Sequence, residues 1–291
     1  GGAAMDVGKL VGRMEGHSIR VWDLEVIGEW WTRADASRIH PIIAVPTTAG
    51  TGSEVGRAAV LTNTADQTKK IIFHPRMLPS LVIGDPELAR GLPPALTAAT
   101  GMDAFTHCFE TFCVESFHPM SDGIALEGLR IIRDFLPRAV KDGQDLEART
   151  MMFAAAMMGG VAFQKGLGAV HSLAHPLGAI HDIQHGLANA VILPYVVAFN
   201  RPAIEAKVAR VAHTLEIEGG FGGFMAWLLA FRRDLGIPHT LAQLGATADR
   251  ADEIAAKALA DPSTGANPRR MTVDDFRRLY LAALEGDLTV S

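Results

Sequence analysis

The chain has 291 residues, of which 48% are hydrophobic and 20% are charged, and its formal net charge is −5. This composition is typical of a globular protein and argues against a disordered or fibrous chain. Lys and Arg form no runs, which argues against nucleic acid as a partner, and the uncharged stretches fall short of the ~18 residues that a membrane span needs.

Strand signals come first along the chain and helix signals follow. Short apolar runs bounded by Gly and Pro predict buried strands at 41–46 (PIIAVP), 70–73 (KIIF) and 80–86 (SLVIGDP). From residue 94 onward, apolar residues recur at spacings of three and four, as in DGIALEGLRIIRDFL, which predicts helices. Pro93 and Pro94 fit the start of a helix but not its interior. The sequence therefore predicts an α/β part over 1–92 and an all-helical domain over 93–291, with a site in the cleft between them.

A glycine-rich loop is predicted directly after the first strand. The segment PTTAGTGSE (46–54) combines Gly50 and Gly52 with several hydroxyl side chains. Free backbone amides in such a turn can cradle phosphate or ribose oxygens, although the same residues also build ordinary loops. GGAAMD at residues 1–6 carries a weaker signal of the same kind. Lys69 or Lys70 could reach a cofactor, although lysines beside strands commonly cap a solvated edge.

The two cysteines and a methionine-glycine run indicate structural roles. Cys108 and Cys113 stand five apart in a predicted helix, so we expect no bridge between them and a reducing compartment such as the cytoplasm. The run from Met157 to Gly160 predicts close helix packing rather than a ligand set.

Carboxylate and imidazole side chains gather in two segments of the predicted helical domain. Asp103 and His107 stand four apart, so they share one helical face, and His171 and His175 repeat this spacing. Since Pro176 disfavours helical geometry at His175, we expect that helix to bend or end there, with further histidines after an irregular connection. One Asp and three His suit Fe(II) or Zn(II) better than Ca(II). The spacing is equally compatible with surface or hydrogen-bonded core histidines.

Six segments together resemble the successive landmarks of the iron-containing (group III) alcohol dehydrogenases, over residues 1 to about 285. They are GGAAMDVGK, PTTAGTGSEV, KIIFHPRMLPSLVIGDPEL, LPPALTAATGMDAFTHCFE, GLGAVHSLAHPLGAIHDIQHGLANAVILP and ALADPSTGANPRRMTVDDF. The resemblance implies a Rossmann-like dinucleotide-binding domain followed by a helical domain, as in the dehydroquinate-synthase-like two-domain architecture. Metal and nicotinamide would face each other across the cleft.

The resemblance also implies roles for individual residues. His175 falls near the nicotinamide and the substrate oxygen, where it would relay a proton. The implied metal ligands are Asp103, His107, His171 and His185. The implied cofactor-binding residues are Gly1, Gly2, Thr47, Thr48, Lys69 and Leu88.

The implied activity is a metal-dependent alcohol dehydrogenase or aldehyde reductase. It would transfer a hydride between NAD or NADP and a primary alcohol, small diol or hydroxy compound, with Fe(II) or Zn(II) polarising the substrate oxygen. Family members are commonly dimers or larger, so we expect a homo-oligomer. They also begin with roughly ninety further residues that carry the first strands of the nucleotide fold. Their GGGS loop is reduced here to Gly1, Gly2, Ala3 and Ala4, which weakens the expectation of cofactor binding.

Three alternatives remain open at this point. A hydroxyacid-oxoacid transhydrogenase shares many of these motifs and would need no added free cofactor. A dehydroquinate-synthase-like lyase also uses NAD and a metal, but it holds the metal with one carboxylate and two histidines and needs basic residues for a phosphorylated substrate. The absence of Lys and Arg from residues 166–200 argues against it. The third alternative is a metal-binding module without activity.

Overall fold

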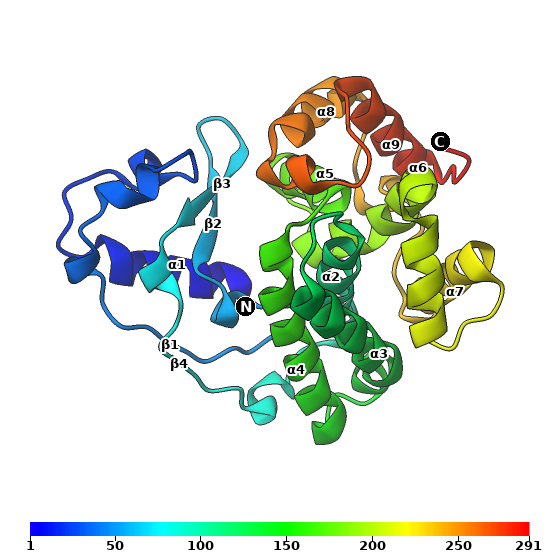
Figure 1. Cartoon of the computed structure of the whole chain (residues 1–291), viewed down its shortest axis with the longest axis horizontal. Helices are drawn as coiled ribbons and strands as arrows, with labels where there is room; N and C mark the ends of the chain where they lie inside the picture. The colour runs from blue at the N-terminus through cyan, green and yellow to red at the C-terminus, as the bar shows by residue number, and fades with distance from the viewer. Residues whose placement is uncertain (291) are drawn as a thin grey trace.

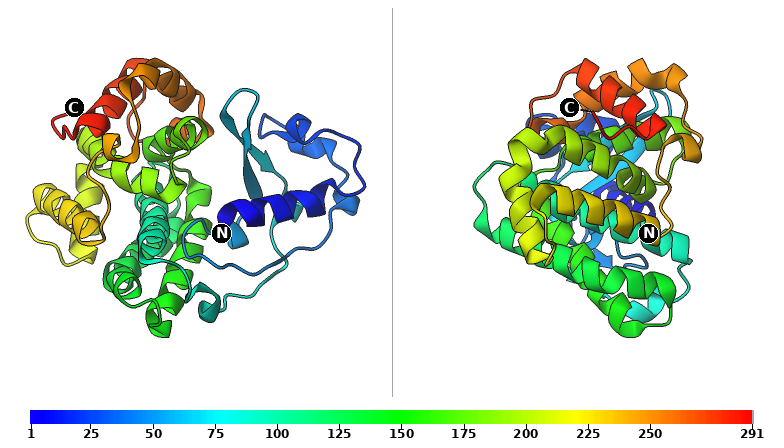
Figure 2. Two further views of the ribbon diagram at one scale, coloured as in Figure 1. Left: turned by 180° about the vertical axis from the view of Figure 1, so that it is seen from behind. Right: turned by 90° about the vertical axis from the view of Figure 1, so that its right-hand side faces the viewer.

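The computed structural model of the chain describes residues 1–290 (Figure 1). Helix α1 and the strands lie on one side of the molecule, and helices α2 to α9 pack together on the other (Figure 2). Within the described residues, every strand precedes residue 83 and helices α2 to α9 follow Pro93. The order agrees with the predicted one, and the division into domains at residues 92 and 93 stays a prediction.

Helix α1 (Gly2–Met14) packs against the hairpin of β2 (Ala58–Asn63) and β3 (Thr68–Phe73), whose strands are antiparallel. Buried Lys9 fastens α1 to the glycine-rich loop, because its Nζ donates to Ser53 Oγ at 2.8 Å. The small apolar core of this part comprises Leu10, Leu24, Ala34, Ala59, Ile72 and Met77.

The predicted strands are only partly confirmed. KIIF lies in β3, whereas the other two apolar runs form only the short parallel pair β1 (Ile43–Ala44) and β4 (Leu81–Val82). The prediction that these two are buried is wrong, since Ile43 is 62% and Leu81 is 51% exposed. The hairpin partner β2 was not predicted. An apolar run shows that a strand prefers burial, but not which of its faces the rest of the fold covers.

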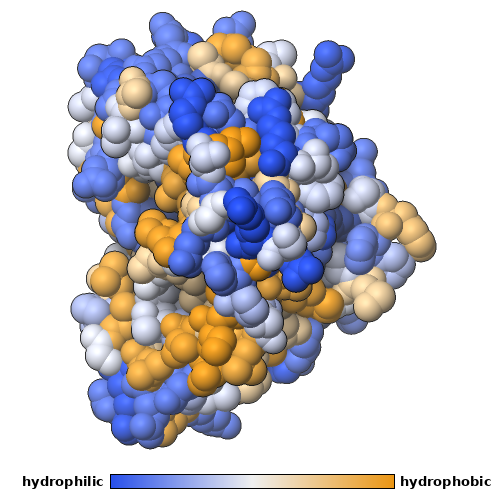
Figure 3. Space-filling view, turned by 90° about the vertical axis from the view of Figure 1, so that its left-hand side faces the viewer, coloured by the Kyte–Doolittle hydropathy of each residue, from blue (hydrophilic) through white to orange (hydrophobic). Residues whose placement is uncertain are grey.

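Large apolar side chains are exposed on the N-terminal part. Figure 3 faces this part and shows apolar side chains gathered over its lower half. The exposed large apolar side chains of this part include Val7 and Val11 on α1 and, in and around the short strands, Ile43, Val45, Leu78, Leu81 and Ile83.

Up to residue 290, the helical part contains eight α-helices around one continuous apolar core. Helix α2 begins at Pro94, as predicted, and is buried on nearly all sides by its neighbours. Its central position explains how its polar side chains come to lie inside the protein. In chain order the helices are α2 (Pro94–Cys113), α3 (Pro119–Lys141), α4 (Leu146–Ala162), α5 (Ala169–His181), α6 (His185–Thr214), α7 (Gly220–Asp234), α8 (Ala251–Ala260) and α9 (Val273–Glu285).

Helix α5 continues through Pro176, so of the predicted bend or end at His175 the end does not occur. Proline removes one backbone hydrogen bond, and the conformational preference that it imposes on the preceding residue is outweighed here by packing. The whole stretch from Ala169 to Leu177 is buried. The helix ends at His181, where Asp182 adopts a left-handed φ of 54°. As predicted, a short connection then leads to His185, the first residue of α6.

Helix α6 is long and apolar enough to cross a membrane, which the uncharged stretches of the sequence did not suggest. In α6, 72% of the most apolar 18-residue stretch is buried inside the protein. It also contains Pro194 and Pro202. Its hydrophobicity is therefore explained by its place in the core of the helical part.

Both cysteines are buried in α2, and burial raises the pKa of each thiol to about 12. Because the thiolate is the reactive form, a thiol reagent at mildly alkaline pH should label neither Cys108 nor Cys113 in the native protein. The same reagent should label both after unfolding in urea. The labelling is read by mass spectrometry, and rapid modification of the folded chain would contradict the burial described here.

Candidate metal centre

Helix α2 presents a carboxylate and an imidazole from adjacent turns of one face. Asp103 and His107 are both buried, and the distance from Asp103 Oδ1 to His107 Nε2 is 3.9 Å. On α5, His171 places its Nε2 at the same distance from this oxygen. The three ligating atoms all lie within 4.8 Å of one another, a spacing that suits a shared ion.

His185 approaches the same carboxylate from the start of α6. Its Nε2 lies 3.6 Å from Asp103 Oδ1, and its side chain is 24% exposed, more than those of the other three. The next residue, Gly186, allows this approach, because a Cβ there would lie 2.3 Å from the carbonyl oxygen of Ala99 in α2. Asp103, His107 and His171 thus form a close group, and His185, the fourth residue that the resemblance implies as a ligand, lies beside Asp103 but outside that group.

Burial favours the neutral form of two imidazoles of this centre, His107 and His185. It lowers the pKa of His107 to about 4 and the pKa of His185 well below its usual value. The positive charge of nearby Lys69 lowers the pKa of His185 further. A neutral ring keeps the lone pair that binds a metal, so at neutral pH the site is ready for a cation.

Asn189 provides a test of whether a cation fits the centre. Its Nδ2 lies 2.7 Å from Asp103 Oδ1, 3.2 Å from His171 Nε2 and 3.3 Å from His185 Nε2. Its own Oδ1 is buried without a hydrogen-bond partner. The acceptor atoms therefore converge on a region that attracts a positively polarised group. One carboxylate and three imidazoles fit Fe(II) or Zn(II) there.

His175 stands beside this centre and lines a cleft. Its Nδ1 lies 2.6 Å from Asp261 Oδ2, and its ring stacks on that of His185 with the centroids 5.4 Å apart. The cleft has a volume of about 500 Å³ and runs between the β2–β3 hairpin and helices α5 and α8, with Lys69 among its lining residues. A small reactant in this cleft would meet the imidazole of His175.

Lys69 points into the same region without a partner. Within residues 1–290 its Nζ makes no hydrogen bond or ion pair, and a Cβ on Gly178 of α5 would lie 3.1 Å from this atom. Burial lowers the pKa of Lys69, while Asp103 and Asp261 oppose this shift. By contrast, neighbouring Lys70 is paired with carboxylates.

The other residues implied as cofactor-binding divide into two places. The amino group of Gly1 donates to Thr47 Oγ1 at 3.3 Å, and a Cβ on Gly1 would contact the Thr48 side chain. Gly2 begins α1 against the same loop, where a Cβ would lie 2.6 Å from Thr51 Cγ2. Leu88 lies apart in a single helical turn, is 48% exposed, and is not among the residues that line the cleft.

Three residues around the centre were missed by the sequence analysis: Glu110, Asn189 and Asp261. Glu110 follows His107 by three positions and Asn189 follows His185 by four, so helical spacing contained a signal for both. Asp261 reaches His175 from 86 residues away, and no local pattern reports such a contact.

Two family models match nearly the whole chain. The model of iron-containing alcohol dehydrogenase matches residues 1–86, and the C-terminal model of the Fe-containing alcohol dehydrogenase family matches residues 97–284. The chain is 40% identical to a 4-hydroxybutyrate dehydrogenase of Cupriavidus necator, covering 96% of this chain and 75% of that protein. It is 35% identical to an NAD-dependent methanol dehydrogenase of Bacillus methanolicus, with 98% and 75% covered.

Solved structures agree with these relatives. A 1,3-propanediol oxidoreductase aligns with a TM-score of 0.91 and 38% identity, covering 98% of this chain and 75% of that one. A sulfoacetaldehyde reductase from Bifidobacterium kashiwanohense, solved in complex with NAD+, aligns with a TM-score of 0.87 and 30% identity, covering 97% and 74%. In sequence and in fold, the chain therefore belongs to the iron-containing alcohol dehydrogenase family of oxidoreductases.

Proposed function

We propose that the chain is a metal-dependent alcohol dehydrogenase and aldehyde reductase that exchanges a hydride between a small primary alcohol and NAD or NADP. The observation that carries this proposal is the convergence of Asp103, His107, His171 and His185 beside a cleft. The names of the relatives, which refer to 4-hydroxybutyrate, methanol and 1,3-propanediol, support small hydroxy compounds as the substrate class.

The four ligands would hold Fe(II) or Zn(II), which when bound polarises the substrate oxygen and stabilises the negative charge that develops on it. His175 would exchange the proton of the substrate hydroxyl with solvent in the cleft. Asp261 accepts from Nδ1 of this ring and thereby leaves Nε2 as the atom that exchanges the proton.

The glycine-rich loop and Lys69 would hold the cofactor. Thr47 and Thr48 lie beside the start of α1, where the amino group of Gly1 donates to Thr47 Oγ1 and the missing side chain of Gly2 lets the helix approach the loop closely. The N-terminus of a helix favours a bound anionic group. Lys69 would donate to the nicotinamide ribose. Leu88 is exposed at the edge of this part, and its apolar side chain would contact the bound cofactor. These assignments rest on the resemblance, and the positions of the loop and Lys69 support them.

Further proposals concern the setting of the enzyme. We propose that residues 1–92 and 93–291 act as a cofactor-binding domain and a metal-binding domain. The protein would work in the cytoplasm as a homo-oligomer on small alcohols and aldehydes, without nucleic acid or membrane as a partner. Light scattering on the purified protein tests the oligomeric state.

Replacing Lys69 with methionine should weaken NADH binding about tenfold, because a hydrogen bond from a charged group contributes ~1.5 kcal/mol or more. The matched control is Lys70→Met, which removes a neighbouring lysine that Glu25 and Asp66 already hold. Titration of the nicotinamide fluorescence measures both dissociation constants. Equal affinities for the wild type and Lys69→Met would remove Lys69 from the cofactor site.

The activity is tested on protein reconstituted with Fe(II) or Zn(II) under anaerobic conditions. Methanol, 1,3-propanediol and 4-hydroxybutyrate are offered with NAD and with NADP, and reduction of the nicotinamide is followed by its absorbance. We expect turnover of at least one hydroxy compound, lost on chelation and restored by metal. A turnover rate that does not depend on added free cofactor would favour the transhydrogenase instead. No turnover with any substrate would overturn the proposal.

A further inference from the structure

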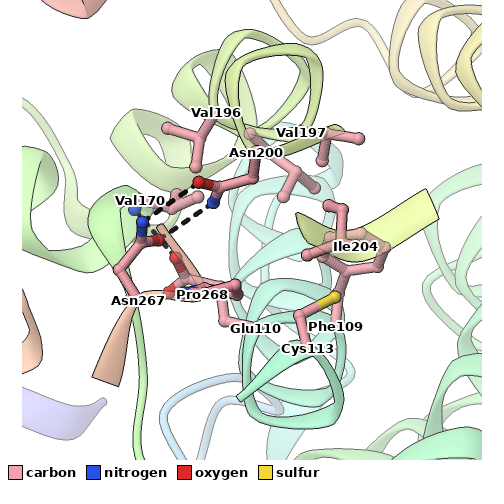
Figure 4. Close-up of a pocket in the computed structure, with 12 residues that line it drawn as sticks. Phe109, Glu110, Cys113, Val170, Val196, Val197, Asn200, Ile204, Asn267 and Pro268 are labelled. Atoms are coloured by element: carbon pink, nitrogen blue, oxygen red, sulfur yellow. Dashed lines mark hydrogen bonds between the residues drawn. The ribbon is translucent and has the colours of Figure 1, made fainter. Parts of the chain in front are cut away.

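Glu110 lies behind the metal centre, fully inside the helical part. Its Oε2 is 2.6 Å from Nδ1 of His171, and its Oε1 accepts from the backbone N–H of Val170 at 2.8 Å. Figure 4 shows Glu110 on α2, close to Asn267 and Asn200, within a ring of apolar side chains. The free space beside it is only about 10 Å³, at the lower limit for one water molecule.

The two partners of Glu110 make different demands on a substitute. Val170 can only donate, because its partner atom is a backbone N–H. His171 must also donate from Nδ1 if its Nε2 is to keep the lone pair that faces Asp103. A carboxylate accepts both bonds, whereas an amide of the same shape would turn its NH₂ toward one of the two donors.

The start of α5 explains how a carboxylate is tolerated in this dry position. Gly168, which precedes the helix, offers no side-chain cap. Two side chains from outside α5 cap this helix instead. Glu110 Oε1 accepts from the backbone N–H of Val170, and Asn267 Oδ1 accepts from the backbone N–H of Ala169 at 3.2 Å. A side chain at 168 would crowd both acceptors, since a Cβ would lie 2.9 Å from Glu110 Oε1 and 3.0 Å from Asn267 Oδ1. The positive end of the helix dipole favours a negative charge there.

We infer that Glu110 is the positioning residue of the metal centre, which fixes His171 in the tautomer with Nδ1 protonated and Nε2 free for the metal. The inference rests on the proposed metal site. Glu110 is not itself a ligand, because both its oxygens face away from the ion toward Val170 and the far nitrogen of the ring. Groups that orient a ligand in this way contribute about 10- to 100-fold to metal affinity.

The test compares Zn(II) affinity, measured by competition with a chelator, in the wild type and two variants. Glu110→Gln should bind Zn(II) 10- to 100-fold more weakly, since the bond that selects the ring tautomer is lost. Asn267→Ala is the matched control, because it removes the other acceptor at the start of α5 without touching His171. We expect the control to lower the melting temperature of the metal-free protein but to keep Zn(II) affinity within about threefold.

Wild-type affinity in Glu110→Gln would overturn the inference, and so would an equal loss in both variants, which would make the effect one of helix capping. A wild-type protein that binds no Zn(II) would instead overturn the proposed metal site. A second measurement covers the case in which Glu110→Gln does not fold. Nitrogen NMR of histidine-labelled, metal-free wild-type protein should find His171 protonated on Nδ1, and protonation on Nε2 would contradict the assignment.

Discussion

Asp103→Asn is expected to remove bound Fe(II) or Zn(II) and to lower alcohol oxidation by roughly a thousand-fold, since a metal Lewis acid contributes several kcal/mol to the transition state. The substitution keeps the shape of the side chain but removes the only negative charge among the four ligands. Asp103 is also the shared point of the site, with Oδ1 within 3.9 Å of Nε2 of all three histidines.

Elemental analysis after reconstitution and steady-state kinetics measure the two effects together. The matched control is Asp252→Ala, which removes an exposed carboxylate that pairs with Arg277 on the surface of the helical part. The control should keep both metal and turnover. An Asp103→Asn variant with full metal content and wild-type turnover would refute the ligand assignment.

Gly160→Ala should destabilise the protein by about 3 kcal/mol and weaken NADH binding. A Cβ at this position of α4 would lie 2.7 Å from the carbonyl oxygen and 2.8 Å from the Cα of Gly52. Gly52 has a φ of +62°, so the loop backbone cannot easily move aside. The methyl group would therefore push the proposed cofactor loop away from α4.

Urea unfolding and nicotinamide fluorescence measure these two consequences. Gly8→Ala is the control, because Gly8 lies inside α1 with open space around its missing side chain. Alanine there should stabilise the protein by up to about 1 kcal/mol. Unchanged stability of Gly160→Ala would show that the loop and α4 are not packed as closely as described.

The sequence predicted the parts of the site that depend on helical spacing. Asp103 and His107 share a face because they are four residues apart in a helix that begins at Pro94, and both features can be recognised locally. The assignment of His171 and His185 to one centre came from resemblance, since spacing alone left the histidines open. Close helix packing was also predicted for the run from Met157 to Gly160, and Gly159 fits it, since a Cβ there would lie 3.1 Å from His107 Cβ in α2. The contact of Gly160 with the loop at Gly52 was not predicted.

The features that the sequence analysis missed depend on distant contacts. Asp261 and His175 are 86 residues apart, and Glu110 and His171 are 61 apart, so no periodic pattern links the members of either pair. The spacing of Glu110 from His107 placed it on the same side of α2, but not against His171. The apolar runs at 41–46 and 80–86 were expected to be buried because they are apolar, but the burial of a strand depends on what covers its sheet. Pro176 was given too much weight, because packing along α5 outweighs the preference of one residue.

Titration of metal-free protein with cobalt(II) tests the central claim most directly, because its visible spectrum reports the number and geometry of the ligands. We expect a saturable spectrum of low coordination number at one equivalent per chain, and no such spectrum with Asp103→Asn. If the spectrum remains that of hydrated cobalt(II) at every ratio of metal to protein, one carboxylate and three imidazoles do not converge on a single cation.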